Sequence, residues 1–243
     1  MKILAIDSSG MTASVAVADG QKILAEFTTN DKKTHSQTLL PMLDDLVRMT
    51  GLDLADIDAI AVAAGPGSFT GLRIGSATAK GLGLALDRPL IAVPTVEALA
   101  ANLYDVPGLI VPMMDARRSQ VYTGIFRFTD HALVTVREQW PCDAAELCSI
   151  LDSYGEPVTV LGDGVPVCRE ILKECLHVSW SEAPAHLNRQ RAAAVAITAA
   201  RYYEEGRTVS AEAHVPEYLR LSQAERERAE RQKMDAAKKE EQA

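Results

Sequence analysis

The sequence predicts an α/β protein in which one unit occurs twice, forming two lobes around a cleft. Apolar runs of strand length alternate with segments of 3.6-residue period, a pattern typical of a mainly parallel sheet covered by helices. The order βββαβαβα can be written for residues 1–107 and again for residues 108–221. With 243 residues, the chain is long enough to bury a core in each lobe.

In the first lobe the predicted strands are short apolar runs separated by turn residues. Asp19-Gly20 is a hairpin signal between the second and third strands. Periodic apolar positions indicate the helices. The predicted strands are 2–6, 14–18, 23–28, 59–64 and 90–93, and the predicted helices are 34–50, 70–86 and 96–104.

Pro107-Gly108 marks a break, after which the same order repeats. An aspartate ends the first strand of each lobe, Asp7 in one and Asp115 in the other. The predicted strands of the second lobe are 109–114, 121–128, 133–138, 158–161 and 177–180, and its predicted helices are 143–153, 165–176 and 185–205. This duplicated order resembles the actin, sugar-kinase and Hsp70 (ASKHA) fold.

Composition excludes several function classes. A net charge of −8 gives no footprint for strong, unaided binding of nucleic acid. The four cysteines form no CxxC pair, and we expect them to be small buried side chains in a reducing cytosol. The N-terminus enters a strand rather than a signal peptide, and no apolar run approaches the roughly 18 residues of a membrane span. We therefore expect a cytoplasmic protein with no membrane partner.

Residues 222–243 differ from the rest of the chain. They contain six basic and six acidic residues and no aromatic residue. Pairs such as Glu227 and Arg231 could support a solvated helix. We interpret this segment as a charged tail, helical or disordered.

A glycine-rich joint between the fourth strand and the second helix, residues 64–75, organises the first lobe. Glycines allow close backbone approach, and the first turn of a helix can hold an anion. However, the spacing matches neither the P-loop nor GxGxxG. Two interpretations stay open: a tight turn, or a weak nucleotide or phosphate contact. The candidates for that contact are Asp7, Ser8, Gly65, Gly67 and Ser68.

The helix after this joint carries small residues at every fourth position. They are Gly71, Gly75, Ala79 and Gly83, which share one face. Each glycine costs roughly 0.8–1 kcal/mol relative to alanine inside a helix, so close packing must offset the penalty. The neighbour packed there is either another element of this chain or a second protein.

Residue chemistry gives little support for catalysis. Asp7 and Asp115 are placed as catalytic carboxylates would be, but aspartates at strand ends more commonly cap turns. The second hairpin, residues 116–120, has no glycine to admit a phosphate. The five histidines are scattered without ligand spacing, and Ser68 does not fit GxSxG. We assign no catalytic residue and no metal site.

Several blocks of sequence together resemble one family, TsaB, also called YeaZ. They are the opening Ile3–Ser9, His35-Ser36 with Leu39-Leu40-Pro41, the block 64–75, Met114–Arg117 and Val121-Tyr122. The resemblance spans about residues 1–220. One position departs from the family pattern, because Gln120 stands where a glutamate is usual. No role is assigned to it.

The resemblance implies a function in tRNA modification. TsaB is similar to TsaD, the actin-like enzyme that attaches threonylcarbamoyl to the adenosine next to the anticodon of tRNAs reading codons that begin with A. TsaB is the non-catalytic scaffold and activator that works with TsaD and the ATPase TsaE. In TsaD, a His-x-x-x-His metal pair follows the strand that corresponds to residues 90–93. Here residues 94–99 read Pro-Thr-Val-Glu-Ala-Leu, without either ligand.

The resemblance also implies where partners bind. TsaB and TsaD pair through helices that correspond to residues 34–50 and 70–86, and the same face could form a homodimer when TsaD is absent. The expected interface residues are Leu39, Met42, Leu43, Leu46, Gly71, Gly75, Ala79 and Gly83. We expect tRNA to be reached indirectly through the complex and no cofactor of the chain's own. An ATP or ADP at the interface of the complex stays open.

Two other functions are weighed against this one. The chain could be a free-standing actin-like, ATP-dependent enzyme, either a kinase or a carbamoyl transferase. It could also be a peptidase, as older names for the family suggest, but that activity would need a metal or a triad. The missing metal ligands and the second hairpin without glycine favour the scaffold.

Overall fold

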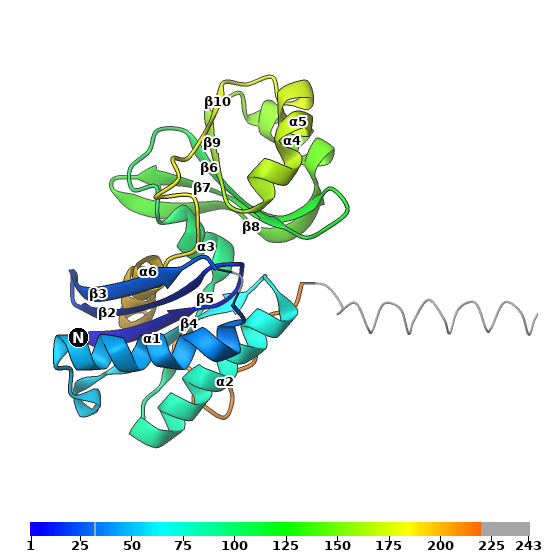
Figure 1. Cartoon of the computed structure of the whole chain (residues 1–243). Helices are drawn as coiled ribbons and strands as arrows, with labels where there is room; N and C mark the ends of the chain where they lie inside the picture. Colours follow the sequence, from blue (N-terminus) through cyan, green and yellow to red (C-terminus); the bar gives the residue numbers. More distant parts are fainter. Residues whose placement is uncertain (32, 220–243) are drawn as a thin grey trace, which may run out of the picture.

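Two five-stranded sheets, each with its own helices, form the body of the protein (Figure 1). The structure is a computed structural model, and it describes residues 1–31 and 33–219. The predicted charged tail at 222–243 lies outside these residues. Within the described ranges, no helix is both long enough and apolar enough to cross a membrane.

The predicted βββαβαβα order is confirmed in both halves, with one added 3-10 turn, Leu54–Asp56. The elements of the first half are β1 Lys2–Asp7, β2 Ala13–Asp19, β3 Lys22–Thr29, α1 His35–Thr50, β4 Ala59–Gly65, α2 Phe69–Leu86, β5 Leu90–Pro94 and α3 Thr95–Ala100. Those of the second half are β6 Leu109–Asp115, β7 Gln120–Thr129, β8 Ala132–Asp143, α4 Ala144–Tyr154, β9 Val158–Leu161, α5 Gly164–Cys175, β10 Trp180–Glu182 and α6 Ala192–Glu204.

The two sheets have the same topology. The first runs β3-β2-β1-β4-β5, and the second, read from its other edge, runs β8-β7-β6-β9-β10. In each sheet the three opening strands pair antiparallel and the later strands join in parallel. The carboxyl ends of β1 and β6, where Asp7 and Asp115 stand, therefore occupy equivalent places in the two sheets.

Helices α1 and α2 lie together on one face of the first sheet, and α6 lies on the other (Figure 1). The predicted boundary at residues 107/108 puts α6 in the second lobe, and for this helix the prediction is wrong. Ala192, Val195, Ala196 and Ala199 of α6 pack against the first sheet. That face of the sheet is itself largely alanine, so a helix with a small-residue face fits closely against it.

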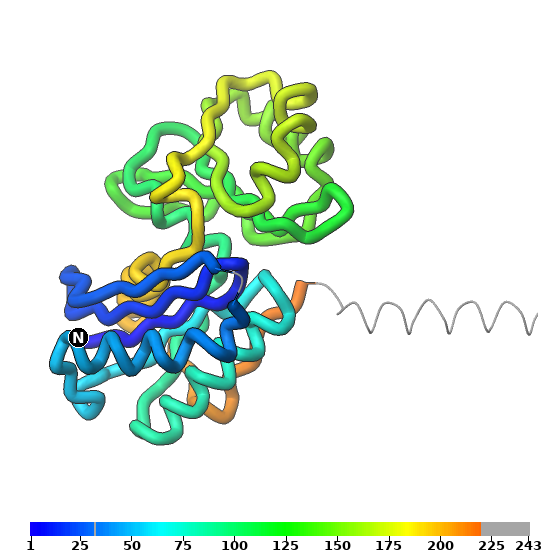
Figure 2. Tube along the Cα trace, viewed as in Figure 1, coloured from blue at the N-terminus to red at the C-terminus, as the bar shows by residue number. Residues whose placement is uncertain are grey.

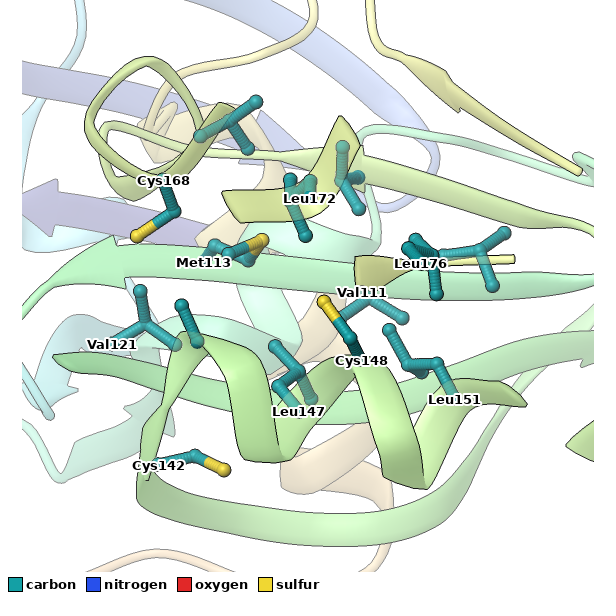
Figure 3. Packing of buried hydrophobic residues seen from close by; sticks show 14 of the residues in the cluster. Val111, Met113, Val121, Cys142, Leu147, Cys148, Leu151, Cys168, Leu172 and Leu176 are labelled. Atoms are coloured by element: carbon teal, nitrogen blue, oxygen red, sulfur yellow. The ribbon is translucent and has the colours of Figure 1, made fainter. Parts of the chain in front are cut away.

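Helices α4 and α5 cover the outer face of the second sheet. Its core includes Cys142, Cys148 and Cys168, which lie among leucines and valines (Figure 3). The prediction of buried, unpaired cysteines is confirmed for these three, and Cys175 is half-buried. On the inner face, α3 packs between the sheets. Its apolar side chains join a cluster with Ile110, Met114, Phe126, Leu161 and Ala183.

Some element bounds differ from the prediction near the points where the chain crosses between the halves. Helix α6 begins at Ala192 rather than near residue 185, and β10 spans Trp180–Glu182 rather than 177–180. Residues 183–191 are a crossover that runs from the second sheet to the first. Asn102, in the other crossover, donates hydrogen bonds to the carbonyls of Leu187 and Arg189 (3.2 and 2.8 Å). The segment preceding α6 is thus held as a loop.

Candidate functional site

A groove of about 640 Å³ lies between the two halves, at the carboxyl ends of β1, β4 and β6. One wall is the turn after β1 together with the start of α2, and the other is the end of β6 with Arg117 and Asp163. Residues 217–219 of the C-terminal segment also line it. This groove brings together the strand ends that the sequence singled out in both halves.

The glycines of the joint between β4 and α2 are required by the chain's own backbone. Gly65 has φ +125°, and a Cβ there would overlap the carbonyl oxygen of Glu217. A Cβ at Gly67 would overlap the carbonyl oxygen of Ser9, which accepts a hydrogen bond from the Ser68 amide at 2.6 Å. The joint therefore has the geometry of a tight turn, and the phosphate contact assigned to these glycines stays a prediction.

The two serines among the candidate phosphate contacts are both engaged in local structure. Ser68 is the N-cap of α2, and its hydroxyl accepts a hydrogen bond from the Gly71 amide at 3.3 Å. The Ser8 hydroxyl is buried and donates to the Gly71 carbonyl at 2.9 Å. The Ser8 side chain therefore fixes α2 against the turn after β1, whereas the Ser68 side chain caps the helix itself.

Asp7 is buried directly beneath the groove, with 1% of its surface exposed. One carboxylate oxygen accepts hydrogen bonds from the amide and the hydroxyl of Ser9, at 2.9 and 2.6 Å. Burial raises the pKa of Asp7 to about 6, although the Ser9 hydrogen bonds and His35 oppose the shift. Asp7 thus stabilises the turn after β1. This is the turn-capping role that the sequence left open beside a catalytic one.

In the second half, Asp115 plays the equivalent part. It accepts a hydrogen bond from the Arg117 amide at 2.8 Å, and its own amide donates to Asp163 at 3.2 Å. Burial is the main cause that raises the pKa of Asp163. Arg117, Arg118 and Ser119 at the hairpin tip all have positive φ. Of these three residues, Arg117 lines the groove.

The segment after β5 carries no histidine at the place where the resemblance puts metal ligands, and its one carboxylate, Glu97, is already paired. Thr95 and Val96 are buried in the first turn of α3. Glu97 accepts a hydrogen bond from the Tyr202 hydroxyl at 2.5 Å and pairs with Arg201. Within the described ranges, no group of three or more His, Cys, Asp and Glu side chains could hold a metal ion.

The small-residue stripe of α2 faces this chain's own sheet, so the prediction that it meets a partner is wrong. Gly71, Gly75, Ala79 and Gly83 are all buried. A Cβ at Gly71 would overlap the Ser8 carbonyl, and one at Gly75 the Ser8 hydroxyl. At Gly83 the neighbours are Leu90 and Ala211. The alternative left open by the sequence, a neighbour within the same chain, is correct.

The prediction that apolar residues of α1 contact a partner is also wrong for its three leucines. Leu39, Leu43 and Leu46 are at most 6% exposed and belong to the core between α1, α2 and the sheet. Met42 is half-buried against the same core. The three leucines therefore stabilise the monomer and are not available to a partner, whereas the predicted interface role of the partly exposed Met42 stays a prediction.

The opposite side of α2 carries no charge, and it is exposed except at Ile74, which is partly buried against the core. We call it the outer face; it comprises Thr70, Ile74, Ala77, Gly81 and Leu84. Leu84 is 55% exposed, and Leu40 of α1 is 58% exposed. An added Cβ at Gly81 would meet nothing within 4 Å. Sequence reasoning missed this face, although its spacing of four, three, four and three residues is a helical stripe.

The two cations of α2, Arg73 and Lys80, point away from the outer face. Arg73 lies over the Phe69 ring at 4.0 Å and donates to the Tyr218 hydroxyl at 3.4 Å. Lys80 donates to the carbonyls of Glu212 and His214, both at 3.1 Å. The C-terminal segment thus covers one flank of α2 and leaves the outer face apolar.

Comparisons with known proteins decide the family. The chain is 35% identical over 233 residues to the tRNA threonylcarbamoyladenosine biosynthesis protein TsaB of Bacillus subtilis, a match that covers 96% of this chain and 100% of that protein. The chain belongs to the TsaB family. The Escherichia coli member is 32% identical over 90% of this chain and 95% of its own length.

The fold agrees with this assignment. YeaZ from Pseudomonas aeruginosa superposes with a TM-score of 0.77 at 27% identity, covering 90% of this chain and 99% of that one. The family model of TsaD, described as tRNA N6-adenosine threonylcarbamoyltransferase, matches residues 22–228. The TsaB family is therefore TsaD-like, and the actin-like fold class predicted from the element order is confirmed.

Proposed function

We propose that this protein is a non-catalytic subunit of the machinery that forms threonylcarbamoyladenosine in tRNA, where it works with TsaD and TsaE as a scaffold and activator. The observation that carries the proposal is the segment after β5. Where the catalytic relative is expected to hold its metal, Glu97 is committed to Arg201 and Tyr202. That ion pair joins α3 to α6 and leaves no carboxylate for chemistry.

The carboxylates at the groove support the same proposal. Asp7 and Asp115 each accept a hydrogen bond from a backbone amide two residues further on. Such contacts fix turns, whereas a catalytic acid needs an oxygen directed at a substrate. The groove is thus formed by residues that maintain its shape.

The outer face of α2, with Leu40 of α1, is the surface that we propose for TsaD. A helix–helix interface needs apolar area and small residues that let two backbones approach. Leu40 and Leu84 supply exposed apolar side chains, and Ala77 and Gly81 leave room for a neighbouring helix. A second copy could use the same face when TsaD is absent. tRNA would then be reached through the complex.

Reconstitution tests the proposed function. Purified TsaD and TsaE are mixed with unmodified tRNA, ATP and the threonylcarbamoyl donor, with and without this protein, and modified adenosine is measured by mass spectrometry. We expect modification only in the complete mixture and none with this protein alone. Modification by this protein alone would establish the alternative of a free-standing enzyme, and full activity without it would exclude an activator.

A further inference from the structure

The described part of the C-terminal segment after α6 returns along α2 and reaches the groove at residues 217–219 (Figure 2). Val209 pairs with Leu90, at the open edge of β5, through two backbone hydrogen bonds of 2.9 Å. Further along, Lys80 holds the carbonyls of Glu212 and His214. We call residues 209–219 the strap. Because its contacts are spread along its length, the strap is fixed to the first sheet up to the groove.

Glu217 of the strap contacts both halves of the protein. Its amide donates to the Ala64 carbonyl at the end of β4, at 2.7 Å. Its carboxylate accepts a hydrogen bond from the Gln139 side chain of β8, also at 2.7 Å. The backbone is held on the first sheet and the side chain on the second, so this residue spans the groove that it lines.

Other connections between the halves include the pair of His131 with Asp105, neither of which lines the groove. The apolar cluster of α3 joins the two sheets, and Arg201 of α6 donates to the carbonyl of Leu133, which packs against that cluster. The two crossovers are held together by Asn102. A helix packed between two sheets is a suitable pivot, because small sliding movements preserve its contacts.

The hydrogen-bonding state of the Gln139 side chain favours a contact with Glu217 that can break. Its amide donates to Glu217, but its side-chain oxygen is buried without a hydrogen-bond partner. An unpaired buried acceptor is costly, and opening of the groove would expose it to water. The closed arrangement thus gains one hydrogen bond and leaves one buried acceptor unsatisfied, and these two contributions to its free energy have opposite signs.

We propose that Glu217 and Gln139 form a latch that sets the opening of the groove, and that its release lets the halves separate about α3. The proposal concerns this chain alone and does not depend on the proposed function. Releasing the latch widens the groove while the strap backbone stays on β4. The groove is then an adjustable feature of the molecule.

A polarity swap tests the latch. Gln139→Glu places two carboxylates together and should open the groove, because like charges repel. Glu217→Gln alone keeps a donor and an acceptor and should resemble the parent. The double variant restores a carboxylate–amide hydrogen bond with the roles exchanged. Spin labels on Asp44→Cys in α1 and Glu174→Cys in α5, both exposed sites, report the separation in a Cys175→Ser background.

The expected result is a longer and broader distance distribution for Gln139→Glu, restored to the parent distribution in the double variant. Thermal unfolding of each variant checks that the fold is intact. An unchanged distribution in a folded Gln139→Glu variant would overturn the latch. So would a shift that Glu217→Gln fails to reverse, because the effect of Gln139→Glu would then not act through Glu217.

Discussion

At the scale of one residue, burial of the Asp7 carboxylate beside the groove lowers the stability of the fold at neutral pH. Its pKa of about 6 means that the folded chain keeps a proton that the unfolded chain releases near pH 4. The stability that Asp7 contributes is therefore present at low pH and lost as the pH rises through about 6.

The variant Asp7→Asn tests this linkage, because an amide cannot ionise. Relative to the parent, its free energy of unfolding should rise between about pH 4 and pH 7.5, by on the order of 2–3 kcal/mol. Urea unfolding at the two pH values measures the difference. A gap between variant and parent that does not change with pH would contradict the raised pKa.

The glycines of α2 show what the sequence could and could not predict about a residue. The four-residue spacing established that Gly71, Gly75 and Gly83 share a face. It could not establish which way that face points, because leucines lie on several sides of the helix: Leu72 is buried and Leu84 is exposed. The direction is decided by Ser8, whose backbone and side chain fill the space beside Gly71 and Gly75.

Two alanine substitutions distinguish the inward glycines from the outward one. Gly71→Ala should lower the free energy of unfolding by about 1–3 kcal/mol, because its Cβ overlaps the Ser8 carbonyl. Gly81→Ala should raise it by about 0.5–1 kcal/mol, since its Cβ meets nothing and alanine favours helix. Chemical denaturation measures both, and equal effects at the two sites would show that the stripe does not face the sheet.

At the scale of elements, the order of strands and helices was predictable but the placement of α6 was not. Element order does not say which sheet a helix covers when the chain crosses between two similar sheets. The contact that places α6 joins residues far apart in the sequence. Glu26 of β3 accepts hydrogen bonds from the Ala193 amide, at 3.0 Å, and from Arg191. Its carboxylate thereby fixes the first turn of α6.

Removal of this contact should loosen α6. Glu26→Ala is expected to lower the free energy of unfolding by about 1–3 kcal/mol, because it leaves the Ala193 amide without its partner. The matched control is Asp45→Ala, which breaks the exposed pair with Arg48 and should change stability by less than about 0.5 kcal/mol. Similar losses for both variants would indicate that Glu26 has no special role.

At the scale of the whole molecule, duplication and family were predictable because both depend on local patterns and short motifs. For the partner surface, the sequence allowed a prediction of helices but not of the exposed residues on them. The resemblance indicated two helices, and docking on them stays a prediction, but most of the interface residues named there belong to the monomer's own core. Amphipathic periodicity marks the face that folding buries, and a docking face must be found from what remains exposed.

The affinity for TsaD tests the central claim most directly, because it separates the outer face from the rest of the surface. Calorimetric titration compares the parent with Gly81→Arg on the outer face and with Ser149→Arg, an exposed site on α4 of the second half. Gly81→Arg is expected to weaken binding by about tenfold or more, roughly 1.4 kcal/mol, while Ser149→Arg should bind like the parent. A folded Gly81→Arg variant that binds TsaD as tightly as the parent would contradict the central claim.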